Sequence, residues 1–72
     1  MIHQPSDWDG KRVRDLRIRL GMSQTELAAA INTQTGMRVH RHAVSRWESD
    51  EVQPSAYVRL ALDTLDKERA NG

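Results

Sequence analysis

The sequence predicts an all-α fold, a small domain of four short helices joined by brief links. Apolar residues recur at helical spacing in four segments, and each segment has its own start and stop signals. Strand signals are weak, because Phe is absent and the β-branched residues are scattered. The 72 residues suffice for one domain. A domain of this size buries only about 60% of its unfolded-chain surface, which leaves little room for an enclosed active site.

The first helix is predicted over residues 10–20. Asp9 is a suitable N-cap, because its carboxylate can accept hydrogen bonds from free amides of the first turn. Trp8 before the cap and Val13 inside the helix have the spacing of a hydrophobic staple. Gly21 can adopt the left-handed conformation that ends a helix. The apolar face of this helix carries Val13, Leu16 and Leu20.

The second helix is predicted to start within the segment MSQTEL, where Ser23 and Glu26 have the spacing of a capping box. The segment LAAAI follows, and its alanines favour helix and permit close approach of another helix. Two ends are compatible with the sequence. The helix stops at Asn32, or it continues to Gly36.

The third helix is predicted over residues 41–49, although His40 is a poor N-cap. At about 100° per residue, this segment divides into two faces. The predicted core face carries Ala43, Val44 and Trp47. The opposite face spans an arc of about 140° and carries Arg41, His42, Ser45, Arg46 and Ser49.

The fourth helix is predicted over residues 56–67, after a turn with the sequence DEVQPS in which Ser55 can act as the N-cap. Its apolar stripe carries Val58, Ala61, Leu62 and Leu65. Tyr57 and Leu60 lie beside this stripe, and the final ERANG segment is expected to fray. The chain therefore divides into an N-terminal tail (1–8), a helical domain (9–67) and a C-terminal tail (68–72).

The net charge of +1 conceals an uneven distribution along the chain. Residues 11–46 hold eight of the eleven Lys and Arg residues and two of the ten acidic residues. One interpretation is a basic face directed at an anionic partner. The alternative is an ordinary solvated surface.

Several functional classes are not expected. Cys is absent, which excludes disulfides and thiolate ligands and suits a cytoplasmic setting. No apolar run approaches the length of a membrane span, and the N-terminal segment MIHQPSDWDG lacks the pattern of a signal peptide. His40 and His42 would point about 200° apart on a helix, which is poor geometry for one metal ion. We expect no metal, no cofactor and no enzymatic activity, because no base is placed beside a nucleophile.

The helices at residues 24–32 and 41–49 have the layout of a helix-turn-helix, whose second helix enters the major groove of DNA. The segments LRIRLGMSQTELAAAI, VHRHAVSRWES and QPS resemble the lambda-repressor-like (XRE/Cro-type) helix-turn-helix transcriptional regulators. The resemblance covers about residues 9–55. The short form is similar to compact regulators of phages and mobile elements, some of which autoregulate anti-CRISPR operons.

The resemblance implies roles for individual side chains. The base-contacting positions of the third helix are Arg41, His42, Ser45 and Arg46. Positions at the start of the second helix contact DNA phosphates, which implies this role for Ser23 and Gln24. Arg17 and Glu48 occupy positions that form an internal ion pair between the first and third helices.

This sequence departs from the family pattern in three places. Residues 33–38 (TQTGMR) are extra and predict a longer turn, in which Arg38, and His40 after it, would face a phosphate. Asp50 and Glu51 replace the usual Gly and basic residues, so we expect phosphate contacts from the basic first helix instead, through Arg12, Arg14 and Arg19. The common fifth helix is missing, so the family's dimer contact cannot be transferred. We expect the dimer surface at Tyr57 and Leu60, or at the long turn.

The sequence therefore predicts a sequence-specific regulator of transcription, most simply a repressor, that binds double-stranded DNA. One recognition helix reads few base pairs, so we expect a homodimer on an inverted repeat, with half-sites about 34 Å apart. No small-molecule ligand is implied. The alternative is an antitoxin-type protein-interaction module, which is disfavoured because only five residues (68–72) follow the expected last helix.

Overall fold

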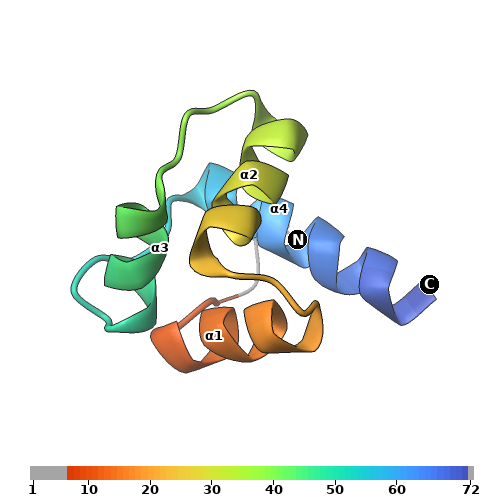
Figure 1. Cartoon of the computed structure of the whole chain (residues 1–72), viewed down its shortest axis with the longest axis horizontal. Helices are drawn as coiled ribbons and strands as arrows, with labels where there is room; N and C mark the ends of the chain where they lie inside the picture. Colours follow the sequence, from red (N-terminus) through yellow and green to blue (C-terminus); the bar gives the residue numbers. More distant parts are fainter. Residues whose placement is uncertain (1–6, 72) are drawn as a thin grey trace, which may run out of the picture.

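The computed structural model describes the backbone of residues 7–71 and the side chains of residues 7–68. Four helices and no strand are present in this part of the chain, which confirms the predicted all-α class (Figure 1). The helices are α1 (Gly10–Arg19), α2 (Gln24–Thr35), α3 (Arg41–Glu48) and α4 (Ala56–Asn71). Helix α2 packs against both α3 and α4, and α1 packs against α3.

Helix α1 starts as its cap predicts, because the Arg12 amide donates to the Asp9 carboxylate at 2.8 Å. Its first residue, Gly10, touches the end of α3. A Cβ atom added at Gly10 would collide with the backbone carbonyl oxygens of Trp47 and Glu48. Glycine therefore permits an approach of α1 to α3 that no other residue would allow.

Helix α2 has the predicted capping box, with both of its hydrogen bonds between Ser23 and Glu26. It takes the longer of the two predicted ends. The helix runs to Thr35, and Gly36 closes it in the left-handed conformation at φ 74°. The expectation that residues 33–38 all lie in the turn is therefore wrong, since three of them extend α2. The link to α3 is residues 36–40.

Helix α3 matches its predicted span to within one residue. His40 occupies its N-cap position without a side-chain capping bond, as expected. Helix α4 begins after Ser55, whose hydroxyl accepts from the Val58 amide at 3.3 Å. Helix α4 runs to Asn71, past its predicted end at residue 67, and extends beyond the other helices (Figure 1). The fraying of residues 68–72 stays a prediction. No helix in the described part of the chain is long and apolar enough to cross a membrane.

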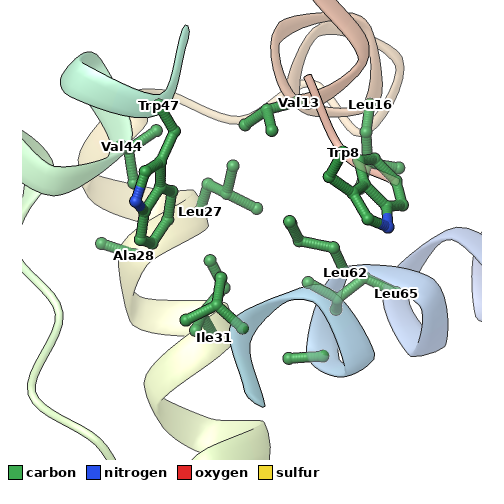
Figure 2. Packing of buried hydrophobic residues seen from close by; sticks show 12 residues of the cluster. Trp8, Val13, Leu16, Leu27, Ala28, Ile31, Val44, Trp47, Leu62 and Leu65 are labelled. Carbon is green, nitrogen blue, oxygen red and sulfur yellow. The ribbon is translucent and has the colours of Figure 1, made fainter. Parts of the chain in front are cut away.

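The four helices meet around one apolar core, which includes both tryptophans (Figure 2). The buried residues are Trp8, Val13, Leu16, Leu27, Ala28, Ile31, Val44, Trp47, Val58, Ala61, Leu62 and Leu65. Trp47 lies in this core as the helical phase of α3 predicts. Trp8 also belongs to it, although the division of the chain placed it in the tail. Its indole Nε1 donates to the carboxylate of Asp63 at 2.8 Å, which ties the segment before α1 to α4. Residues 1–6 of the predicted tail lie outside the described residues.

Candidate nucleic-acid interface

Helix α3 is strongly two-sided. Val44 and Trp47 are buried against the other helices and fix the rotation of α3 about its own axis. The remaining face is open to solvent and carries the four predicted base-contacting residues, Arg41, His42, Ser45 and Arg46, all of them exposed. An eight-residue helix is about 12 Å long, so these four side chains are presented within a short span.

The C-terminal end of α3 is attached to α1 by a two-point ion pair. Arg17 Nε donates to Glu48 Oε2 at 2.6 Å, and Arg17 Nη2 donates to Glu48 Oε1 at 3.1 Å. The side chains are only 18% and 9% exposed. The hydrogen bond to Glu48 raises the pKa of Arg17 above its ordinary value, with a further contribution from the charge of Glu48, and burial opposes both. The ion pair expected between α1 and α3 is thus present, and it is internal rather than available to a ligand.

The start of α2 joins the same cluster. Gln24 is the first residue of α2, and its amide Nε2 donates to Glu48 Oε1 at 3.3 Å. The Ser23 hydroxyl accepts from the Glu26 amide, and its own proton remains available for a further bond. The expected phosphate-contacting pair, Ser23 and Gln24, therefore lies next to the end of α3. The Ser23 backbone N–H is not available to a phosphate, because it donates to the Glu26 carboxylate.

The link between α2 and α3 is anchored by one residue that the motif did not identify. Asn32 accepts from the Val39 amide through Oδ1 at 2.7 Å and donates to the Val39 carbonyl through Nδ2 at 3.0 Å. Val39 is half-buried against the core, whereas Arg38 and His40 on either side of it are exposed.

An open groove lies along the side of α3 that faces this link. Its basic and histidine residues are Arg38, His40, His42 and Arg46. Its apolar residues are Met37, Val39, Ala43, Trp47, Val52 and Val58. The structure therefore brings two predicted phosphate contacts and two predicted base contacts to the border of one concave surface.

The three arginines of α1 that were predicted to contact phosphates, Arg12, Arg14 and Arg19, do not lie together. At about 100° per residue, Arg14 is about 60° around the helix from Arg17, on the side where α1 meets α3. Arg12 and Arg19 lie about 140° and 160° from Arg17. These two line a different groove, which they share with Asp66 of α4. Arg12 and Arg19 thus lie away from the side of α1 that carries Arg17, whereas the helical phase of Arg14 is close to that side.

Arg12 also has partners within the chain. Its guanidinium lies 3.9 Å from the centroid of the Trp8 ring, and its Nη1 donates to the Asp7 carbonyl at 2.6 Å. Its Nη2 is 3.9 Å from a carboxylate oxygen of Asp66. These contacts hold the Arg12 side chain over the N-terminal segment, so its position gives no support to the predicted phosphate contact.

The acidic residue after α3 has a structural role that sequence reasoning missed. Asp50 adopts the left-handed conformation at φ 63°, and its carboxylate accepts from the Gly10 amide at 2.8 Å. A carboxylate at this place stabilises the positive N-terminal end of α1. Asp tolerates the left-handed conformation better than most residues. This tolerance could have indicated from sequence that Asp50 adopts the left-handed conformation. It could not have indicated the bond to Gly10, which lies 40 residues away in sequence.

The predicted dimer residues lie on a separate surface. Tyr57 is 71% exposed and Leu60 is 51% exposed, which is high for side chains of this size. They border a shallow groove between α4 and the end of α2, together with Gln34, Thr35, Ala61 and Thr64. No group of three or more His, Asp or Glu side chains within the described residues is placed to hold a metal ion.

The comparisons with known proteins agree with this geometry. A family model described as helix-turn-helix matches residues 13–58, from within α1 to the start of α4. No curated protein and no solved structure matched the chain. The matched region holds α2, the link and α3, and it covers well over half of the chain. The protein is therefore a member of the lambda-repressor-like helix-turn-helix family of DNA-binding regulators.

Proposed function

We propose that this protein regulates transcription by binding a specific double-stranded DNA sequence, with α3 in the major groove. The observation that carries the proposal is the exposed basic face of α3 on a firmly held helix. Arg41 and Arg46 project from that face, while buried Val44 and Trp47 and the Glu48 ion pair prevent the helix from rotating or shifting.

The exposed face has the chemistry for reading base edges. An arginine fork donates to both O6 and N7 of guanine, and each such contact discriminates by about 1–3 kcal/mol. We assign base contacts to Arg41, His42, Ser45 and Arg46. Their exposure and their shared arc on α3 support this assignment.

Phosphate contacts would position α3 along the groove. We assign this role to Ser23, Gln24, Arg14, Arg38 and His40. Gln24 contacts the last residue of α3, and Arg38 and His40 line the groove beside α3. Arg12 and Arg19 belong to the other side of α1 and are left out of this surface.

The protein would act as a homodimer on an inverted repeat, because one eight-residue helix reads too few base pairs for high specificity. Exposed Tyr57 and Leu60 supply apolar area for the contact between protomers. The bound dimer would repress by obstructing polymerase, as an autorepressor of a phage or mobile-element operon acting in the cytoplasm. It would have no enzymatic activity.

The test is selection of duplexes from a random-sequence pool, followed by band-shift titration over a salt series. We expect a selected sequence with two-fold symmetry, and affinity that falls steeply as salt rises, because bound phosphates release counterions. Failure to enrich any sequence would contradict the proposal. A co-purifying protein partner in the absence of DNA binding would favour the antitoxin-type alternative.

A further inference from the structure

Helix α3 is too short to be stable alone, since isolated helices of fewer than about 12–15 residues are marginal in water. Its position therefore depends on anchors outside it. The C-terminal end is held by the Glu48 ion pair, and the middle by buried Val44 and Trp47. The N-terminal end has no comparable anchor of its own, because the side chain of His40 makes no capping bond.

Asn32 supplies an anchor at this end. Its backbone carbonyl accepts from the Gly36 amide at 2.8 Å, and its side chain holds both backbone groups of Val39. One residue of α2 thus fixes the first and the fourth residue of the five-residue link. Val39 lies two residues before Arg41, so its position sets where α3 begins.

The surroundings of Asn32 connect it to the base-reading residues. It is half-buried and lines a concave surface between α2 and α3 together with His40, Arg41 and His42. If Val39 were released, the link could reach other conformations, and the first turn of α3 would have to be ordered again on binding. Ordering on binding costs affinity, and a misplaced first turn costs discrimination.

We propose that Asn32 is a positioning residue for sequence recognition, which sets the placement of Arg41 and His42 without touching DNA. This inference rests on the proposed function of α3. It goes beyond that function because it assigns part of the specificity to the side-chain amide of Asn32. This amide lies outside α3 and holds Val39, seven residues further along the chain. The side-chain amide of Asn32 can do this because it carries both an acceptor and a donor, so it bonds both the N–H and the C=O of Val39.

The experiment compares Asn32→Ala with wild type and with Thr33→Ala. Thr33 is the neighbouring exposed residue of α2, and its hydroxyl bonds only within its own helix, to the Ala29 carbonyl. The DNA probes are the duplex that wild type selects from a random pool and a scrambled duplex of the same composition. Amide hydrogen exchange of the free protein is measured in parallel.

Asn32→Ala should lower affinity for the selected duplex roughly tenfold, the size of one base contact, and leave affinity for the scrambled duplex unchanged. Exchange of the Val39 and Ala43 amides should accelerate, while the Leu27 and Ile31 amides in the core stay protected. Thr33→Ala should match wild type in both measurements. Asn32→Leu keeps the approximate size of the side chain but can neither accept from the Val39 N–H nor donate to the Val39 carbonyl, so it should behave like Asn32→Ala. It serves as the second variant if Asn32→Ala is too unstable to assay.

Equal loss of affinity for both duplexes, or faster exchange spread over Leu27 and Ile31, would show that Asn32 only stabilises the fold, and would overturn the inference. Unchanged protection of Val39 in Asn32→Ala would overturn it as well. If wild type selects no sequence, the proposed function itself fails, and the specificity role of Asn32 fails with it. The exchange measurement then shows separately whether Asn32 anchors the link.

Discussion

The guanidinium of Arg17 meets both carboxylate oxygens of Glu48, at 2.6 and 3.1 Å, and joins the last turn of α1 to the last residue of α3. Two parallel bonds fix orientation as well as distance. The pair is shielded from solvent, and Gln24 of α2 adds a third contact to the same carboxylate. Side chains from α1, α2 and α3 therefore meet at the carboxylate of Glu48.

Replacing Glu48 with glutamine should destabilise the fold. The amide keeps the size of the side chain but removes the charge, and it leaves a partly buried guanidinium without its anion. Because removing one partner of a fully buried pair costs about 3–5 kcal/mol, we expect a loss of about 1–3 kcal/mol in unfolding free energy for this less buried pair. Urea denaturation measures the loss. Glu51→Gln, in the exposed loop after α3, is the matched control and should be neutral. Equal stabilities of the two variants would contradict the role given to the ion pair.

Gly10→Ala should also destabilise the protein, although alanine favours helices by about 1 kcal/mol over glycine. The added methyl group would meet the backbone carbonyl oxygens of Trp47 and Glu48, and backbone atoms cannot move aside as a flexible side chain can. Overpacking of this kind costs about 1–3 kcal/mol, and the melting temperature reports it. Lys11→Ala, at the next and exposed position of α1, should not lower it. A Gly10→Ala variant as stable as wild type would show that α1 can move away from the end of α3 without a loss of unfolding free energy.

The sequence predicted features that depend on neighbouring residues. The Ser23–Glu26 capping box and the Asp9 cap are local patterns, and the structure has both. The two faces of α3 follow from helical phase, and burial of Val44 and Trp47 confirms the division. The Arg17–Glu48 pair is a distant contact, and only resemblance to a family indicated it.

Features that depend on how helices cross were not predictable in the same way. The contact of Gly10 with α3 and the bond from Gly10 to Asp50 join residues about 40 apart in sequence, and no local pattern encodes them. The Asn32 clamp on Val39 depended on the true end of α2, which the sequence left open. Arg12 and Arg19 are basic like Arg14, and their separation from α3 became evident only when α1 was placed against its neighbours.

Arg46→Ala and Arg14→Ala should affect DNA binding differently. Arg46 projects from the proposed base-reading face, so its loss should reduce discrimination between the selected and scrambled duplexes by about 1–3 kcal/mol. Arg14 is exposed on α1 and is a proposed phosphate contact, so its loss should weaken binding to both duplexes and reduce the salt slope by about one unit. Band-shift titrations of both duplexes over a salt series separate the two effects. Intact discrimination in Arg46→Ala would show that the recognition surface is assigned wrongly.

Leu60→Glu should prevent dimer formation while leaving each protomer folded. Leu60 and its neighbour Tyr57 are both more than half exposed on α4, so a charge there costs little in the monomer and opposes burial in a dimer contact. Sedimentation equilibrium should show a concentration-dependent dimer for wild type and a monomer for Leu60→Glu, with similar circular dichroism spectra.

The control variant is Lys67→Glu, which changes an exposed residue further along α4 and should stay dimeric. Because two linked recognition helices bind more tightly than one, Leu60→Glu should also lose affinity for the symmetric duplex while keeping its affinity for a single half-site. A Leu60→Glu variant that still forms dimers would move the interface away from this surface of α4.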